Sequence, residues 1–323
     1  MKIEEKKVLL NRCNFLKVIF KEWCNKEWWY TGIYDQQSGT YLSWYFVRAN
    51  LADKFTFTIF DPQSKEPHQF SKFFWLDKHQ APNRLCLNYD KRGVKLAYNG
   101  RGNDQKGWHF QMKAGQLEAD IEIEPTIPHF TKFDNQIVDN YGLLHFFHNR
   151  ANGVVKIKEK EYRLNNALVY YDHCFGKVPS QTGWHWLAVQ NEQTALASLV
   201  NYGPYAQKYT ESYFTGAEQC PRPNEWIRME QSVSFERENP NSWTAPWWVT
   251  SSDMELKVSL QMHHTGITQI PPIICLLPKF NKFTMNITHT EVFVKADGRI
   301  RVDGKWLKVA NMFGVMEEHF GNW

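Results

Sequence analysis

The stretch Leu117-Glu-Ala-Asp-Ile-Glu-Ile-Glu124 alternates between apolar and acidic residues without a break. Successive side chains of a β-strand point to opposite faces, so this period of two predicts a strand with one buried and one solvated face. Lys54–Phe60 shows the same period, with Phe55, Phe57 and Ile59 on one face. Both stretches predict antiparallel sheets that cover a core with one face and meet water with the other.

Further stretches rich in aromatic and β-branched residues are spread over the chain. They are Gly39–Arg48, Val154–Ile157, Leu168–Tyr171, Thr194–Val200, Glu255–Gln261, Thr284–Val294 and Arg299–Val302. Helical periodicity is confined to one short segment, Lys2–Lys21. Many short strands without alternating helices predict an all-β fold, a sandwich or a barrel with few short helices.

An Asp-Gly pair near the end of the chain predicts a β-hairpin. Ala296-Asp-Gly-Arg299 lies between two strand-like stretches, Glu291–Lys295 and Ile300–Asp303. Asp-Gly is typical of two-residue hairpin turns because both positions accept a positive φ. We therefore expect the chain to reverse at Asp297-Gly298.

A short polar break, Pro179-Ser-Gln-Thr182, separates two halves that are both dense in predicted strands. The length of 323 residues suits two domains of ordinary size. We expect one domain at residues 1–178 and a second at residues 179–323.

The composition favours some partners and argues against others. Aromatic residues make up 15% of the chain, which suits the wall of an apolar ligand cavity, although an aromatic β core explains them equally well. The 38 basic and 34 acidic residues nearly balance and are scattered, which argues against a nucleic-acid partner. The sequence has neither a glycine-rich phosphate loop nor a Cys-x-x-Cys pair, so it predicts no cofactor and no metal site.

The sequence also bears on location. Met1–Phe20 does not resemble a signal peptide, because Glu4–Lys7 are all charged. No apolar run reaches the length of a membrane span. The six cysteines are widely spaced, as in reduced cytosolic proteins. We expect a cytosolic protein without a transmembrane segment; peripheral membrane contact and the oligomeric state stay open.

The stretch Tyr170-Tyr-Asp-His-Cys-Phe-Gly176 carries the strongest candidate chemistry. In a strand, Tyr170 and Asp172 share one face, and Tyr171 and His173 take the other. Apolar surroundings raise the pKa of a carboxyl group because its charged form loses hydration, so Asp172 becomes a candidate proton donor. A turn in which Asp172 bonds to the backbone explains the same residues equally well.

Two other segments carry weaker candidates. If Asp139–His148 is a strand, His145 and Phe147 share a face, and His145 is a candidate for acid–base chemistry or an ordinary structural histidine. In Glu27-Trp-Trp-Tyr30, Trp28 or Tyr30 lines a ligand cavity, or the rings belong to the core.

These segments, together with Gly183-Trp-His-Trp186, resemble the family of carotenoid 1,2-hydratases (hydroxyneurosporene synthases), AttH-like proteins and Diels–Alderases. The family pattern is Glu-Trp-Trp-Tyr near the start, then Asp-His-x-Trp-Gly and Gly-Trp-Asp-Trp in mid-chain. The resemblance implies two tandem lipocalin-like β-barrel domains, with a hydrophobic ligand held at or between them. Here Cys174-Phe175 replaces an acidic-Trp pair, and His185 replaces the Asp of the last motif.

The resemblance implies catalytic roles for Asp172, Tyr170 and His145, with Phe147 at the position of a family Trp. We expect the substrate-binding side chains to be Trp28, Tyr30, Phe147, Trp184 and Trp186. The implied function is an enzyme of natural-product biosynthesis that acts on a polyene, terpenoid or polyketide. It would hydrate this substrate by acid catalysis through Asp172, or cyclise it by orientation as a Diels–Alderase does. The alternative is a non-catalytic lipocalin-like carrier, because a fold does not fix a function.

Overall fold

The computed structural model describes the following residues: 23–48, 52–63, 67–75, 86–91, 93–100, 107–125, 130–134, 141–179, 181–202, 211–216, 220–229, 232–242, 245–269 and 286–322. Within these ranges the chain forms strands, turns and irregular segments, and no residue is helical. The short helix expected at Lys2–Lys21 lies outside the described residues.

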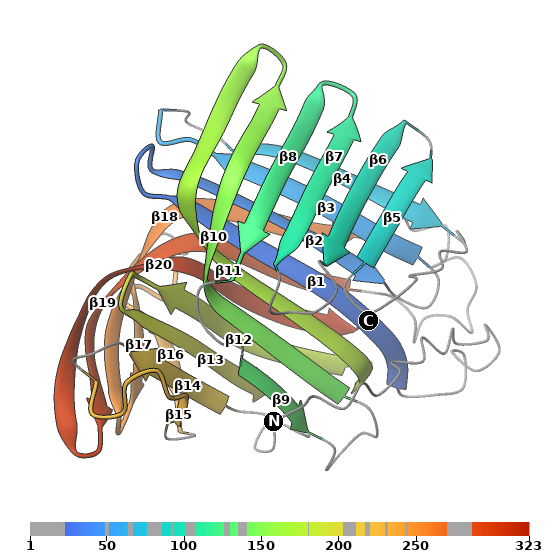
Figure 1. Ribbon diagram of the computed structural model, residues 1–323. Coiled ribbons are helices and arrows are strands. Elements are labelled where there is room, and N and C mark those ends of the chain that lie inside the picture. Colours follow the sequence, from blue (N-terminus) through green and yellow to red (C-terminus); the bar gives the residue numbers. More distant parts are fainter. Residues whose placement is uncertain are drawn as a thin grey trace. The chain divides into compact units, whose positions relative to one another are not determined.

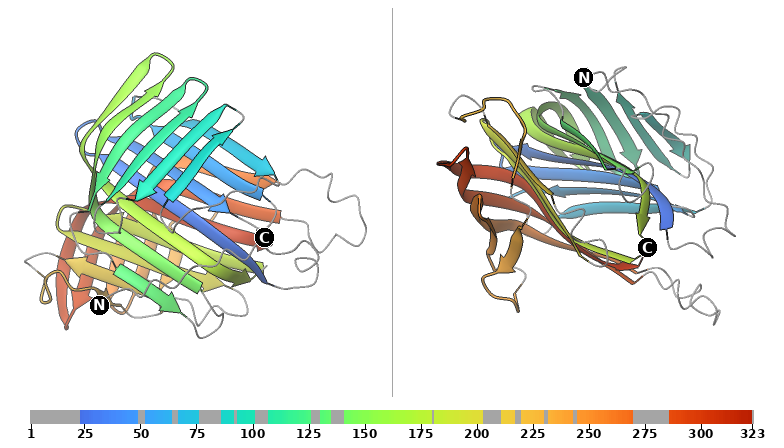
Figure 2. Two further views of the ribbon diagram at one scale, coloured as in Figure 1. Left: turned by 45° about the vertical axis from the view of Figure 1, so that its right-hand side comes forward. Right: turned by 90° about the horizontal axis from the view of Figure 1, so that it is seen from below.

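The chain divides into two compact units, Met1–Val178 and Pro179–Trp323. Each unit has its own β-sheet (Figures 1 and 2). Each unit also has its own cluster of buried hydrophobic residues. The expectation of an all-β fold with two tandem lipocalin-like sheets is therefore confirmed.

Eleven described strands form the sheet of unit 1. They are β1 (Trp23–Asp35), β2 (Thr40–Arg48), β3 (Ala52–Phe60), β4 (His68–Trp75), β5 (Cys86–Lys91), β6 (Val94–Gly100), β7 (Trp108–Ala114), β8 (Leu117–Glu124), β9 (Phe130–Asp134), β10 (Tyr141–Ile157) and β11 (Lys160–Pro179). Their order is β4-β3-β2-β1-β11-β10-β8-β7-β6-β5, with β9 paired to β10. Neighbours along the chain are mostly neighbours in the sheet, as expected for short hairpin connections.

The sheet of unit 1 curls until its two ends face each other. Strands β2 and β7 are far apart in the strand order, yet the rings of Trp44 and Phe110 stack with their centroids 4.0 Å apart. Phe57 of β3 stacks against the same Phe110 ring at 6.5 Å. Phe55, Phe57 and Ile59 all lie in this core, and β8 alternates between buried and exposed as its sequence predicts.

Nine described strands form the sheet of unit 2. They are β12 (Gln181–Gln190), β13 (Thr194–Tyr202), β14 (Glu211–Gly216), β15 (Ile227–Arg228), β16 (Ser234–Arg237), β17 (Trp247–Ser251), β18 (Met254–Gln269), β19 (Asn286–Val302) and β20 (Lys305–Asn322). Their order is β15-β14-β13-β12-β20-β19-β18-β17-β16. The long strands β19 and β20 bend along their length, as the red ribbons of Figures 1 and 2 show.

Unit 2 is curled as well, because side chains from distant strands meet in its core. The ring of His185 on β12 lies 5.4 Å from the ring of Trp247 on β17, although three strands separate them in the sheet. Leu187, Val249 and Met316 belong to the same buried cluster.

In both units the strands near the middle of the sheet have a second face that does not join the core cluster. On β11, Val169 and Tyr171 lie in the core of unit 1, whereas Tyr170 and Asp172 point to the opposite face. On β12, Leu187 joins the core of unit 2, whereas Trp186 does not. The candidate residues are carried by these second faces.

The hairpin expected at Asp297-Gly298 is wrong. Strand β19 runs through both residues, and its register to β20 shifts between Ala296 and Gly298, so the Asp-Gly pair forms a β-bulge. A Cβ atom at Gly298 would lie 2.0 Å from the carbonyl oxygen of Glu255, so only glycine fits. The reversal occurs at Asp303-Gly304, where φ is 47° and 80°.

Two further observations concern the expected location. Among the described residues, no helix is long and apolar enough to cross a membrane. Cys174 and Cys220 are buried free thiols.

Asp61 lies in the irregular segment that follows β3. Its side chain links this segment to a part of unit 1 that is distant in the sequence. Its carboxylate pairs with Lys160 at the start of β11 and accepts a hydrogen bond from the backbone N–H of Gln63 at 2.8 Å. Burial would raise the pKa of Asp61, but the bonds to Lys160 and Gln63 outweigh it, and the pKa is lowered.

We predict that Asp61→Asn lowers the free energy of unfolding at neutral pH by roughly 1–2 kcal/mol. A carboxyl whose pKa is lowered by folding stabilises the protein above its unfolded pKa of about 4 and loses that contribution as the pH falls. The difference between Asp61→Asn and wild type should therefore shrink towards zero below about pH 4, as urea titrations over a pH series would measure. Glu118→Gln, which breaks the exposed pair with Lys113, should change stability little. A pH-independent difference for Asp61→Asn would contradict this role.

Candidate acid–base site

Strands β10 and β11 bring His145 and Asp172 together. The two residues stand directly opposite each other in the antiparallel register. Cross-strand pairs of this kind place their side chains side by side on one face of the sheet. Tyr170 lies two residues before Asp172 and shares its face, so three polar side chains converge on one point.

These three side chains form a continuous hydrogen-bonded chain. The hydroxyl of Tyr170 donates to Oδ2 of Asp172 at 2.8 Å. Nδ1 of His145 lies 3.0 Å from the same hydroxyl oxygen. Because the Tyr170 proton points to Asp172, His145 completes the chain by donating from Nδ1. All three residues are buried, with exposed fractions of 3% for His145, 1% for Tyr170 and 6% for Asp172.

A β-bulge in β10 shapes the site. The register between β10 and β11 shifts between Phe146 and Asn149, and His148 has a φ of 55°. The amide of Asn149 donates to the carbonyl of Phe146 at 2.9 Å and holds the bulge. Phe146 joins the core, while Phe147 stays on the site face and packs on Tyr170. Phe146 and Phe147 thus point to opposite faces, as expected. The bulge that follows interrupts this alternation of faces.

Two aromatic rings pack beside the ring of Tyr170. The ring of Phe147 lies 4.5 Å from that of Tyr170, and the ring of Tyr30 lies 6.1 Å from it. Trp28 is half-buried two residues before Tyr30 on the same face of β1. Trp29, between them, turns to the core and stacks on His173 at 4.9 Å. The site therefore has a polar centre and apolar walls.

The geometry suits proton transfer. A buried carboxylate, a phenol and an imidazole in one hydrogen-bonded chain can pass a proton between its ends without bulk water. In low-dielectric surroundings each hydrogen bond of the chain is stronger than it would be in water.

Trp184 and Trp186 lie in unit 2, on a different sheet. Trp184 stacks on His319 with the ring centroids 3.8 Å apart, and its Nε1 donates to Glu317 at 3.3 Å. Trp186 is buried and stands opposite Glu317 in the register of β12 and β20. The Trp184 indole thus belongs to a polar cluster on the second face of unit 2, and alternation places Trp186 on the same face.

Sequence reasoning missed a second polar network in unit 2. His185 points to the opposite face from Trp184, with Nδ1 2.5 Å from the hydroxyl of Tyr202 and Nε2 2.8 Å from Glu318. Partial burial, and then the Glu318 carboxylate, raise the pKa of Tyr202. The hydratase-like pattern that the sequence resembles has Asp at the position of His185. This replacement is the sequence signal that could have indicated the network.

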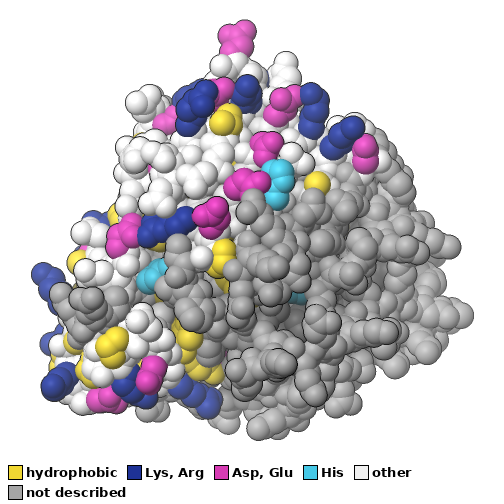
Figure 3. Space-filling view, viewed as in Figure 1, with side chains coloured by type: hydrophobic (Ala, Val, Ile, Leu, Met, Phe, Trp, Pro, Cys, Tyr) yellow, Lys and Arg dark blue, Asp and Glu magenta, His cyan; other side chains and the backbone are white. Residues whose placement is uncertain are grey.

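A surface groove of about 740 Å³ lies elsewhere on unit 1. Its lining includes Lys95, Lys113, Glu118 and Arg163, and none of the candidate residues. Figure 3 shows charged side chains of both signs gathered over this upper part of the visible face.

Comparison with known proteins identifies the family of this chain. The model of a domain of unknown function, DUF2804, matches residues 6–323. The chain belongs to this family. A search of curated proteins finds no match.

Solved structures that share the fold include the following two. One is kievitone hydratase from Nectria haematococca, with a TM-score of 0.64, 13% identity, and coverage of 93% of this chain and 90% of that one. The other is described as an AttH from Nitrosomonas europaea, with a TM-score of 0.60, 11% identity, and coverage of 93% of both chains. The resemblance to AttH-like proteins is thus confirmed at the level of the fold.

We predict that Tyr170→Phe destabilises unit 1 by about 1–3 kcal/mol. The change keeps the ring contact with Phe147 but leaves the buried His145 and Asp172 without their shared hydroxyl. Chemical denaturation would measure the loss, and the imidazole nitrogen resonances of His145 should shift. Tyr45→Phe is the control, because its ring can keep the contact with Lys54 Nζ at 5.3 Å. Equal effects of the two substitutions would contradict the hydrogen-bonded chain.

Proposed function

We propose that this chain is a cofactor-independent hydratase, a lyase that adds water to a carbon–carbon double bond of a hydrophobic small molecule. The hydrogen-bonded chain from His145 through Tyr170 to Asp172 is the observation on which this proposal rests. Hydration of an alkene needs a group that delivers a proton to carbon and a group that accepts one from water. One connected set of side chains serves both needs.

The proposed reaction balances with water as the only co-reactant. Asp172, in its protonated form, gives its proton to one alkene carbon, and the other carbon becomes cationic. A water oxygen bonds to this carbon and loses a proton. That proton passes to Nε2 of His145, while the Nδ1 proton moves to the Tyr170 oxygen and the Tyr170 proton moves to Asp172. Asp172 is thereby reprotonated, and proton exchange between the two imidazole nitrogens with water returns His145 to the Nδ1–H form. Ring faces such as that of Phe147 favour a nearby cation.

The likeness to kievitone hydratase supports this choice of reaction, since that protein is named as a hydratase and shares the fold over most of both chains. Fold likeness alone does not carry an activity, and the connected acid–base groups supply the chemical argument. Trp28, Tyr30 and Phe147 are the proposed substrate contacts in unit 1. Trp184 and Trp186 remain predicted contacts in unit 2.

The class of substrate follows the sequence prediction. A polyene, terpenoid or polyketide would match aromatic walls with few polar groups. Cyclisation of such a molecule and simple carriage of it are the competing functions, and the experiment below separates them. The natural-product pathway and the cytosolic location stay predictions.

The test incubates the purified full chain with a panel of polyenes, terpenoids and polyketides in ¹⁸O-labelled water. We expect a product heavier than its substrate by one labelled water, detected by mass spectrometry. Asp172→Asn should lower the rate by about 10²–10⁴-fold, because it removes the general acid. Binding of the substrate, followed by quenching of Trp fluorescence, should persist in that variant.

Asp35→Asn is the matched control. Asp35 is a buried aspartate of β1 that bonds to Ser38 rather than to the site, so its substitution should leave the specific activity of folded protein unchanged. A product of unchanged mass would point to cyclisation, and bound substrate without product would point to a carrier. Full hydration activity in Asp172→Asn would overturn the assigned acid.

A further inference from the structure

Four side chains of metal-binding type lie on one face of strands β19 and β20. His289 stands opposite His319 in the antiparallel register, and Glu291 stands opposite Glu317. Both strands space these residues by two, so alternation directs all four to the same face. Sequence motifs miss this group because its members come from positions far apart in the chain.

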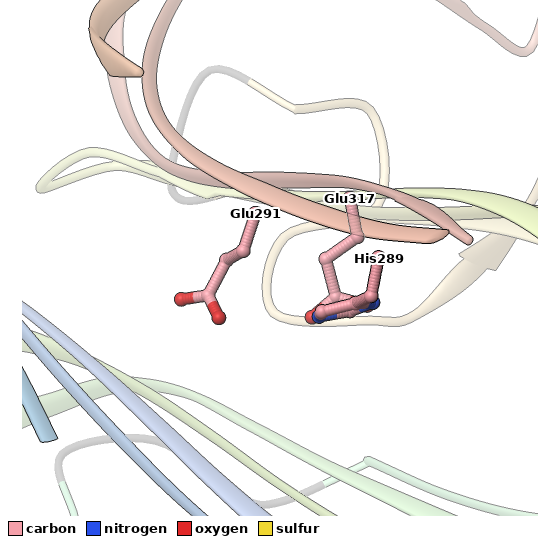
Figure 4. A group of neighbouring side chains, drawn as sticks. All are labelled: His289, Glu291 and Glu317. Atoms are coloured by element: carbon pink, nitrogen blue, oxygen red, sulfur yellow. The ribbon is translucent and has the colours of Figure 1, made fainter. Parts of the chain in front are cut away.

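Three of the four lie close enough to share an ion. Donor atoms of His289, Glu291 and Glu317 are all within 4.8 Å of one another, and the three residues are half-buried. Figure 4 shows their side chains leaving the ribbon of β19 and β20 on the same side. Ligands bound at about 2.1 Å to one tetrahedral ion are roughly 3.4 Å apart, so small side-chain rotations bring the donors to bonding distance.

Neighbouring rings hold two of these side chains in place. Nε1 of Trp184 donates to Oε2 of Glu317 at 3.3 Å. Nδ1 of His319 lies 3.4 Å from Nδ1 of His289, and Trp184 stacks on His319. Bonds of this kind orient ligands in known metal sites, where a bound histidine uses its second ring nitrogen to contact a neighbour.

Charge gives an independent reason for a cation here. Glu291 and Glu317 are directly opposite each other on adjacent strands. Like charges in cross-strand positions destabilise a sheet. A divalent cation between the two carboxylates would turn this repulsion into attraction.

We propose that His289, Glu291 and Glu317 bind one divalent transition-metal ion, with Zn²⁺ the best match to one imidazole and two carboxylates. Zinc accepts both ligand types, and three protein ligands leave a fourth position for water or another small ligand. The ligands all belong to unit 2, whereas His145, Tyr170 and Asp172 belong to unit 1. The zinc ligands and the acid–base residues are thus different side chains, and zinc binding is measured without measuring hydration.

The test uses the full chain after treatment with a chelator. Titration with Zn²⁺ in a calorimeter should show one ion per chain. Co²⁺, as a spectroscopic substitute, should develop the visible absorption typical of low coordination numbers. Glu291→Gln, Glu317→Gln and His289→Gln should each weaken binding by at least tenfold. Trp184→Phe should weaken it by about tenfold, because the indole orients Glu317 without binding the ion.

Glu255→Gln is the matched control, with the same change of charge in the same unit. Glu255 pairs with Arg299, which lies eight residues beyond Glu291 on β19, about 26 Å away along a strand. This variant should bind Zn²⁺ as wild type does. Circular dichroism would identify any variant that loses its fold, and only folded variants are compared. Absence of equimolar binding by wild type, or unchanged binding in the three ligand variants, would overturn the site.

Discussion

The stack of Trp44 on Phe110 joins strands that are far apart in the sheet order of unit 1. The contact requires the sheet to curl, and curling decides which face of every strand becomes the inside. Large rings then fill that inside, including Phe57, Trp108 and Phe146. Side chains on the other face of the central strands do not pack into this core. Unit 2 repeats this arrangement with His185 and Trp247.

The candidate site follows from this constraint. Val169 and Tyr171 are needed in the core of unit 1, so Tyr170 and Asp172 must face away from it. The pairing of β10 with β11 adds His145 opposite Asp172. The same rule in unit 2 directs Glu317 and His289 away from the core that contains Val292 and Met316. The acid–base residues of unit 1 and the cluster of His289, Glu291 and Glu317 thus lie on the faces opposite the two hydrophobic clusters.

Local pattern predicted some features and misled on others. Alternation assigned the faces of Phe55 and Phe57, and it put Tyr170 beside Asp172, because a period of two needs no knowledge of the partner strand. The Asp297-Gly298 pair misled, since the same dipeptide serves a turn or a bulge and the neighbouring strand decides between them. The carbonyl of Glu255, which leaves no space for a Cβ atom at Gly298, makes that decision.

The sequence by itself determined the all-β class and the shared face of Tyr170 and Asp172, because both depend only on alternation within a strand. It also identified His145 as a candidate, although not its partner. Only the tertiary structure decided that His145 meets the Tyr170 hydroxyl, because strand register is set by hydrogen bonds between distant segments. For the same reason, only the fold brought His289 and Glu291 together with Glu317.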